Sequence, residues 1–317
     1  MRPGSGEQRA SRPWCNLPGL LTARAQLPKS RAARLLIALA LLLACAPARA
    51  QEAPRVEWKP YWREFGWEDY VLTSVSSLVI VGTQLIPEDR DRWQPYGFGF
   101  DEAARDALRL ESEHGELYAR DTSDVLMMLS VAYPFLVDSL SVAWWHHGNE
   151  QVAREIGLIS AETLAVTSAV QSIVSGVTSR ERPYGRRCGE DLSDETLYCK
   201  ERNRYRSFFS GHTSISFASA ATLCVHHQHI PLYGGGSGEQ FACALGFVNA
   251  AAVGLLRVAG DRHYLSDVLV GAGIGTLTGL TVPWFLHYRP SRSRGFPADL
   301  SLRVSPLPGG LSVGGDF

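Results

Sequence analysis

The sequence predicts an all-α domain, built as a bundle of six helices, with a short C-terminal β-hairpin as the candidate exception. Apolar residues recur with a helical period in six segments, and no alternating strand pattern interrupts them. The chain has 317 residues and is 45% hydrophobic, which is enough to build a large core. The six segments are residues 69–87, 123–146, 153–178, 212–229, 240–257 and 263–287.

The N-terminal residues 1–50 have the organisation of a leader and signal peptide. Residues 1–30 are rich in Arg, Pro, Ser and Gly, a composition that does not build a packed core. An apolar run from Leu35 to Ala44 follows two arginines, and Ala48-Arg49-Ala50 comes directly before Gln51. This order is typical of a secretory signal cleaved after Ala50. We therefore expect export to a bacterial cell envelope, with the functional site on the periplasmic side.

Three further regions follow the leader. Residues 51–67 are rich in aromatic side chains, and the six helical segments lie within residues 68–288. Residues 289–317 form a linker and tail. Within the tail, residues 300–304 and 310–313 flank a Pro-Gly turn, which favours a short β-hairpin.

The sequence leaves the depth of membrane insertion open. A spanning helix needs about 20 apolar residues, and only the first and sixth segments nearly meet that requirement. Asp138 lies in the second segment, and Glu155 and Glu162 lie in the third, so both resemble helices of a polar-faced bundle. We expect membrane association, either embedded or peripheral. The formal net charge of -1 gives no reason to expect nucleic acid as a partner.

Cysteines and two repeated residue patterns favour structural roles. Export predicts a disulfide between Cys188 and Cys199, which share one polar loop. Cys224 and Cys243 lie in apolar stretches and are expected to be buried small hydrophobes.

Glycines recurring every fourth residue predict close helix packing: Gly271, Gly275 and Gly279. No metal site is predicted, because the clustered histidines close a helix, where imidazoles favour the dipole: His226, His227 and His229.

Histidine chemistry is concentrated between Arg257 and Asp267. His263 and Asp267 are spaced i and i+4, which on a helix places both side chains on one face. A carboxylate there accepts a hydrogen bond from one ring nitrogen and leaves the other free to attack phosphorus. His263 is therefore the candidate nucleophile, and Asp267 is its orienting group.

A second short motif, Ser210-Gly211-His212, precedes a predicted helix with Ser210 as its N-cap. The N–H groups and positive dipole at a helix start bind an oxyanion, so Ser210 and Gly211 are candidate phosphate-binding residues. His212 beside them is the candidate general acid. Arg182 and Arg257 are candidate phosphate-binding cations, because a guanidinium binds phosphate oxygens in pairs and keeps its charge.

Taken in order, these motifs resemble those of the type 2 phosphatidic acid phosphatase superfamily, which includes bacterial acid phosphatases and vanadium haloperoxidases. The resemblance covers about residues 155–287 and implies a helical bundle of that kind. Its first motif keeps Arg182-Pro183, but Ser175 stands where the family has Lys. Arg180 is the candidate substitute cation. Other candidates lie in the following loop: Lys200, Arg202, Arg204 and Arg206.

The resemblance implies an acid phosphatase or phosphatidic acid phosphatase-like hydrolase. Its substrate would be a phosphomonoester, either a lipid phosphate or a small molecule, and a phosphohistidine would form on His263. The resemblance implies no cofactor, and vanadate is expected only as an inhibitor. Two alternatives stay open. In one, the loss of Lys at Ser175 leaves a phospholipid-binding or structural bundle with weakened catalysis. In the other, the chain is a vanadium haloperoxidase.

Overall fold

The computed structural model describes residues 55–87, 89, 93, 97–188, 199, 202–290, 303–307 and 310–314. The chain divides into two units, Met1–Glu52 and Ala53–Phe317. The first unit, including the predicted leader and signal peptide, lies outside the described residues. Within the second unit the domain is helical, which confirms the predicted all-α class.

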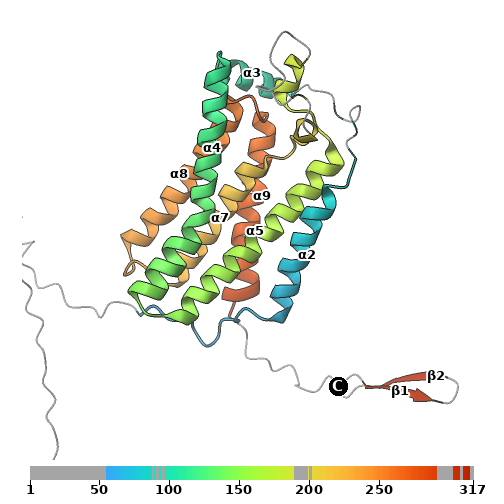
Figure 1. Ribbon diagram of the computed structural model, residues 1–317. Helices are drawn as coiled ribbons and strands as arrows, with labels where there is room; N and C mark the ends of the chain where they lie inside the picture. The colour runs from blue at the N-terminus through green and yellow to red at the C-terminus, as the bar shows by residue number, and fades with distance from the viewer. Residues whose placement is uncertain are drawn as a thin grey trace, which may run out of the picture. The chain divides into compact units, whose positions relative to one another are not determined.

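The described residues form seven α-helices (Figure 1). They are α2 (Trp67–Thr83), α3 (Gly99–Leu108), α4 (Glu113–Tyr133), α5 (Glu150–Thr178), α7 (Gly211–His229), α8 (Ser237–Ala259) and α9 (Leu265–Pro283). Two π-helical segments extend them, with η1 (Pro134–His146) continuing α4 and η4 (Trp284–Tyr288) continuing α9. Two short 3₁₀ helices lie between α5 and α7, namely η2 (Pro183–Arg187) and η3 (Arg202–Tyr205).

Two helical features differ from the sequence prediction. The second predicted segment begins earlier, at Glu113, because Ser112 caps α4 by accepting a hydrogen bond from the Gly115 amide at 3.1 Å. The polar first turns of this helix lack the apolar period on which the prediction rested. Helix α3 was not predicted at all. It is short and amphipathic, and its buried side chain is the acidic Asp101.

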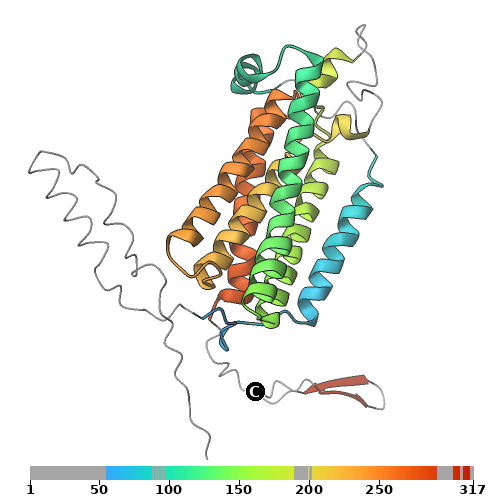
Figure 2. The same ribbon diagram turned by 60° about the vertical axis from the view of Figure 1, so that its left-hand side comes forward.

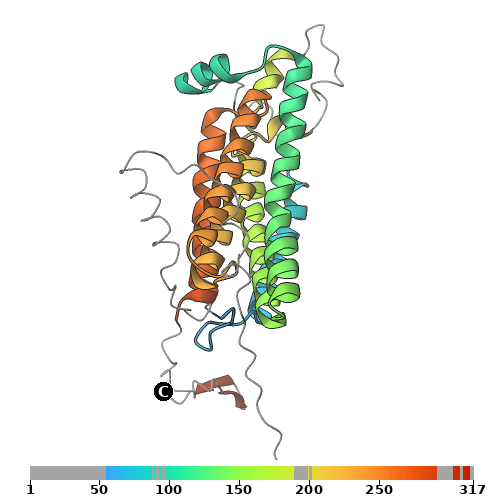
Figure 3. The same ribbon diagram turned by 90° about the vertical axis from the view of Figure 1, so that its left-hand side faces the viewer.

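Helix α7 is the centre of the bundle and packs against α4, α5, α8 and α9. Its contact with α9 is close because small residues line it. A Cβ added at Gly271 would lie 2.7 Å from the Ser210 carbonyl oxygen, and one added at Gly275 would lie still nearer to the Ser214 carbonyl. The predicted close packing by these glycines is therefore confirmed. Figures 2 and 3 show the long helices running side by side along the bundle.

The two ends of the bundle differ in character. At one end, α3 lies beside the C-terminal ends of α5 and α8 and the N-terminal ends of α4, α7 and α9 (Figure 1). An aromatic and aliphatic core fills the other end and includes Trp58, Trp62, Ile156 and Tyr288. The rigid core is thus distant from the helix termini that carry the predicted chemistry.

Within the described residues, four helical segments are long and apolar enough to cross a membrane: Glu113–His146, Glu150–Thr178, Ser237–Ala259 and Leu265–Tyr288. Large apolar side chains also face outward, among them Leu78, which is 70% exposed, and Trp145, which is 83% exposed. The chain is therefore membrane-associated. The second and third predicted segments thus meet the requirement that only the first and sixth were expected to approach, whereas the first, Trp67–Thr83, is not among the candidates. The acidic side chains of the second and third segments face inward. Asp138, Glu155 and Glu162 are each 0% exposed.

Two disulfides bridge the described cysteines. Cys188 pairs with Cys199 across a Cα–Cα distance of 5.6 Å, as predicted. Cys224 pairs with Cys243 at 4.8 Å, which corrects the prediction that these two are unpaired small hydrophobes. The pairing could not be predicted because it depends on how α7 and α8 pack against each other. The helical periodicity of one segment does not reveal which residues of a neighbouring helix it contacts.

The tail contains one antiparallel strand pair. Strand β1 (Arg303–Leu307) pairs with β2 (Gly310–Gly314), with Ser305 opposite Ser312.

Candidate active site

The three predicted motifs converge at one end of the bundle. Arg182 lies just beyond the C-terminal end of α5, and Arg257 lies in the last turn of α8. His212 occupies the first turn of α7, and His263 immediately precedes the N-cap of α9. The antiparallel packing of these helices brings residues that are far apart in the sequence into one cluster.

His263 is held between a cation and a carboxylate. Its Nε2 lies 3.1 Å from Nη1 of Arg182, and its Nδ1 lies 3.5 Å from Oδ2 of Asp267. A guanidinium only donates hydrogen bonds, so Nε2 is the acceptor and Nδ1 carries the proton that faces Asp267. The separation at Nδ1 is longer than an aligned hydrogen bond, as is common in catalytic pairs without substrate. The arrangement presents the lone pair of Nε2 toward Arg182.

The i, i+4 spacing predicted that His263 and Asp267 share one helix face, but their contact has another origin. The two residues do not share a helix face, because Tyr264 is the N-cap of α9 and His263 lies before it. Asp267 is instead the third residue of the helix, and its Oδ2 accepts from the Tyr264 amide at 3.0 Å. The reversal of the chain at the helix start therefore places the carboxylate beside the imidazole.

Asp267 is fixed by a buried polar network. Its Oδ1 accepts from Nη1 of Arg180 at 2.5 Å, and its Oδ2 accepts from the Ser207 hydroxyl at 2.5 Å. Arg180 also donates to Asp101 at 3.1 Å, and all three charged side chains of this network are 0% exposed. The Arg180 guanidinium packs over the rings of Tyr264 and Trp93, at 4.2 and 4.8 Å from their centroids.

This placement corrects the suggestion that Arg180 substitutes for the missing Lys. Both terminal nitrogens of Arg180 are directed at acidic side chains behind His263, so the guanidinium supports the orienting carboxylate. Ser175 itself is buried in the last turn of α5, and its hydroxyl donates to the Ser172 carbonyl at 3.2 Å.

The remaining candidate substitutes have separate partners. Lys200 lies outside the described residues. Arg204 pairs with Glu181 at 2.5 Å, whereas Arg206 donates to the Thr83 carbonyl at the end of α2 at 2.9 Å. The backbone carbonyl of Arg206 also accepts from Arg182 at 3.5 Å. The carbonyl of Arg204 accepts from the Arg182 amide at 2.8 Å, so both loop arginines contact the predicted phosphate-binding residue through their backbones.

The start of α7 has the geometry of an anion site. Ser210 is the N-cap, as predicted, and its hydroxyl oxygen accepts from the Thr213 amide at 3.4 Å. Its carbonyl accepts from the Ser214 amide at 3.0 Å. The first amides of a helix have no acceptor within the helix, so those of Gly211 and His212 point outward with the positive end of the dipole.

A residue that the sequence analysis missed completes the cluster. Asp124 of α4 lies 3.0 Å from Nε2 of His212 through its Oδ1. The same oxygen forms an ion pair with Nη2 of Arg257. Nε of Arg257 is buried and has no hydrogen-bond partner among the described residues, so it remains able to bind an anion. No local motif surrounds Asp124, and only the packing of α4 on α7 and α8 reveals it.

Burial and nearby positive charge lower the pKa values of His263 and His212. Burial, and then the charge of Arg182, lower the pKa of His263 to about 3. The same two causes lower the pKa of His212 to about 4. His263 is therefore neutral near pH 7, as a nucleophile must be. With Asp124 beside it His212 is likewise neutral near pH 7, so it can hold a proton to donate only after further negative charge, such as that of a bound phosphate, raises its pKa.

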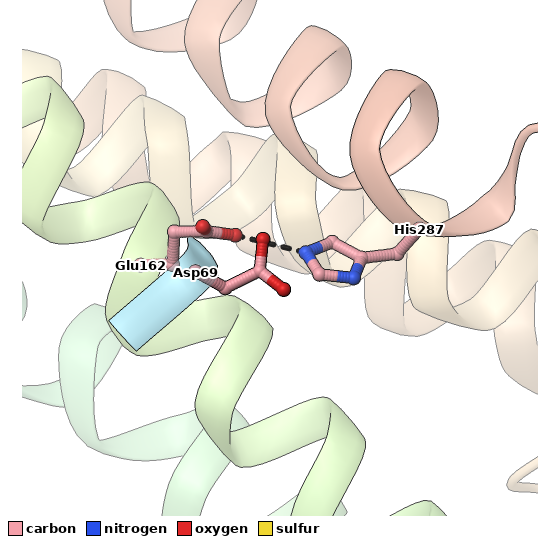
Figure 4. A group of neighbouring side chains, drawn as sticks. All are labelled: Asp69, Glu162 and His287. Carbon is pink, nitrogen blue, oxygen red and sulfur yellow. Dashed lines mark hydrogen bonds and ion pairs between the residues drawn. The ribbon is translucent and has the colours of Figure 1, made fainter. Parts of the chain in front are cut away.

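One further cluster has the composition of a metal site. Asp69, Glu162 and His287 each place a ligand atom within 4.8 Å of the others, and all three side chains are buried (Figure 4). Their charges are matched within the protein, because Arg63 pairs with Asp69 and His287 pairs with Glu162 at 2.8 Å. We interpret the cluster as two adjacent ion pairs that join α2, α5 and η4.

Part of the chain is similar to known proteins. Residues 156–291 match the family model of the PAP2 superfamily. The chain is 33% identical to a lipid A 1-phosphatase of Porphyromonas gingivalis over 78 residues, which are 25% of this chain and 16% of that protein. The aligned segment thus spans about a sixth of the length of that curated relative.

A solved structure is also similar: the first transmembrane PAP2 type phosphatidylglycerolphosphate phosphatase from Bacillus subtilis. The TM-score is 0.43 at 16% identity, and the match covers 69% of this chain and 96% of that one.

Proposed function

We propose that the chain is a member of the PAP2 superfamily, whose model matches residues 156–291, and that it is a phosphatase that removes phosphate from a membrane lipid. The proposal names the reaction as hydrolysis of a phosphomonoester. It is supported by the membrane-associated helices and by the lipid phosphatase among the similar proteins.

One observation carries the proposal: His263 lies between Arg182 and Asp267. The imidazole is neutral, its Nδ1–H faces a fixed carboxylate, and its Nε2 faces a guanidinium at 3.1 Å. A phosphoryl group held by that guanidinium would lie beside the nucleophilic nitrogen. Arg257 and the Gly211 and His212 amides would share its negative oxygens.

In the first chemical step, the lone pair on Nε2 of His263 attacks phosphorus. The bond from phosphorus to the lipid oxygen breaks, and that oxygen takes a proton from His212. Asp267 stabilises the positive charge that develops on the His263 ring. The product of this step is the free lipid alcohol and a phosphohistidine on His263.

In the second step, water replaces the histidine at phosphorus. His212, now neutral, accepts a proton from the water as its oxygen bonds to phosphorus. The phosphorus–nitrogen bond breaks, its electron pair returns to Nε2, and inorganic phosphate leaves. One water is consumed in each cycle, and both histidines return to their starting states.

Phosphate release by detergent-purified protein tests the proposal. We expect release from a diacylglycerol phosphate and from p-nitrophenyl phosphate without added metal, and complete loss of release in His263→Gln. Rapid quenching with phosphorus-labelled substrate should trap label on the wild-type chain only. No release from any phosphomonoester by folded wild-type protein would reject the proposal.

A second candidate function rests on Ser175. A buried serine at the family's Lys position removes one cation from the phosphate site, which favours binding without efficient turnover. Vesicles containing phosphatidic acid would then bind the protein without phosphate release. A vanadium haloperoxidase is the third candidate, and bromide oxidation that depends on added vanadate would identify it.

A further inference from the structure

We propose that Asp124 is the positioning residue for His212, so that the site contains two carboxylate–histidine pairs with different tasks. Oδ1 of Asp124 lies 3.0 Å from Nε2 of His212 and also pairs with Arg257. This inference rests on the proposed phosphatase function and adds a residue outside the three sequence motifs.

The position of Asp124 favours a role beyond closing a surface ion pair. Its side chain is 41% exposed, whereas its partner Arg257 is 4% exposed and His212 is 31% exposed. The carboxylate therefore extends from α4 to the entrance of the cluster and contacts two groups with separate tasks. One oxygen fixes both the predicted acid and a predicted phosphate-binding cation. A change at Asp124 should consequently affect proton donation before it affects folding.

The charges around His212 explain why such a residue is needed. Asp124 faces it from α4, Arg257 lies beside Asp124 on α8, and the charge of Arg182, from the segment after α5, also acts on the ring. Asp124 supplies the carboxylate in contact with the ring, and a bound phosphate would add further negative charge. Both favour the protonated imidazole, against burial and the charge of Arg182.

In the proposed role, Asp124 assists the transfer of one proton from His212 to the leaving oxygen. As the bond from phosphorus to the leaving oxygen breaks, the electron pair goes to that oxygen, and His212 delivers a proton to it. Asp124 holds the ring in place and stabilises the charged form before transfer. A poor leaving group, such as a lipid alkoxide, needs this proton, whereas p-nitrophenolate leaves without it.

The test compares Asp124→Asn with wild type on both kinds of substrate. We expect kcat for a lipid or alkyl phosphate to fall by about 10- to 100-fold, the range in which supporting residues act. Turnover of p-nitrophenyl phosphate should change by less than about threefold, since that leaving group does not need the acid. The basic limb of the kcat profile should move to lower pH, because His212 loses its anionic partner.

Two further variants distinguish an effect on proton donation from an effect on folding or on general surface charge. Asp124→Glu retains the charge and should recover part of the activity toward alkyl phosphates if Asp124→Asn folds poorly. Asp121→Asn is the matched control, because Asp121 lies on the same helix, is 58% exposed and pairs with Arg120 at 2.6 Å. Its leaving-group dependence should equal that of wild type.

Four results would overturn the inference. Equal losses on alkyl and p-nitrophenyl phosphates would assign Asp124 to phosphate binding or folding. Tighter inhibition of Asp124→Asn by vanadate would indicate that the carboxylate competes for the phosphate position. If wild-type protein releases no phosphate from any substrate, the proposed function fails and this inference fails with it. An active wild type with an unchanged Asp124→Asn profile rejects the inference alone.

Discussion

Nη1 of Arg182 donates to Nε2 of His263 across 3.1 Å, and this contact determines which ring nitrogen of His263 carries the proton. Because arginine never accepts a hydrogen bond, the contact selects the tautomer in which Nδ1 carries the proton. The positive charge also contributes to lowering the pKa of both His263 and His212. Arg182 therefore helps burial to keep His263 neutral, and in the proposed mechanism it also binds phosphate.

Replacing Arg182 should separate these two effects. We expect Arg182→Met to reduce kcat/KM by at least about 100-fold, since a charge-assisted phosphate contact is lost. The pKa of His263 should rise at the same time, because burial remains but the nearby cation is gone. Titration of the histidine ring by NMR in detergent measures that rise. Arg182→Lys keeps a charge and should show a smaller pKa change, and equal pKa values in all three proteins would contradict the assignment.

The Arg180 network should govern stability and, through Asp267, catalysis. Arg180→Ala leaves Asp101 and Asp267 buried without their cation, a change that costs about 3–5 kcal/mol. We expect a large fall in the melting temperature and loss of turnover. The conservative Arg180→Lys should recover part of the stability.

Vanadate binding distinguishes this role from that of a substitute cation. If Arg180 only positions Asp267, folded Arg180→Lys protein should bind vanadate with nearly wild-type affinity while turning over slowly. A selective loss of vanadate affinity with normal stability would return Arg180 to the phosphate site. Arg206→Ala is the matched test of the loop, because it removes the guanidinium that donates to the Thr83 carbonyl at 2.9 Å.

Much of this architecture could be predicted from the sequence, because the relevant signals are local. Helical periodicity located all six long helices, and the N-cap at Ser210 follows from residue type and context. The motif residues Arg182, His212 and His263 could be recognised from their order and spacing. The structure brings these three side chains together, but their chemical roles stay predictions.

The missed features depend on contacts between helices. Asp124 lies in the middle of α4 and resembles any polar helix residue until α4 is packed beside α7 and α8. The partner of Cys224 is likewise set by the register of α7 against α8. Arg180 looked like a phosphate ligand because it neighbours Arg182, yet the turn after α5 directs its side chain toward Asp267.

The glycines of α9 provide a matched pair for testing helix packing. A Cβ at Gly275 would collide with the Ser214 backbone, whereas one at Gly273 would meet nothing within 4 Å. Gly275→Ala should therefore lower stability by about 1–3 kcal/mol and reduce turnover, because α9 carries Asp267 and α7 carries His212. Gly273→Ala should be neutral or stabilising by up to about 1 kcal/mol. Equal melting temperatures for the two variants would show that α9 does not approach α7 this closely.

Acid should destabilise the folded protein through its buried neutral histidines. The pKa of His263 is lowered to about 3 from an ordinary value of 6.5, so between these values the unfolded chain binds a proton that the folded chain does not. Stability is therefore constant above about pH 6.5 and falls as the pH decreases through this window, by about 1.4 kcal/mol per pH unit for one histidine. Melting temperatures from pH 8 to pH 4 measure the effect. His263→Gln should flatten the curve, and an unchanged slope would exclude His263 as a contributor.

The two disulfides should differ in function although they enclose loops of similar size. Their sequence separations are 11 and 19 residues, so chain entropy predicts about 3 kcal/mol of stabilisation from each. The Cys188–Cys199 bridge lies in the segment between Arg182 and Ser210, and the Cys199 carbonyl accepts from Arg204 at 3.5 Å. Cys188→Ser with Cys199→Ser should therefore lower both stability and kcat/KM. Cys224→Ala with Cys243→Ala should lower the melting temperature and leave kcat/KM within about twofold.

Peptide mapping of protein isolated from cells links these bridges to the predicted export. If residues 31–50 act as a cleaved signal, the mature chain should begin at Gln51 and carry both bridges in oxidised form, since disulfides persist in an oxidising compartment. Reduction with dithiothreitol should then reproduce the combined loss of stability seen in the two double variants. A retained leader with free thiols at Cys188 and Cys199 would contradict export. It would also place the phosphate site on the cytoplasmic side, where a different leaflet supplies the lipid.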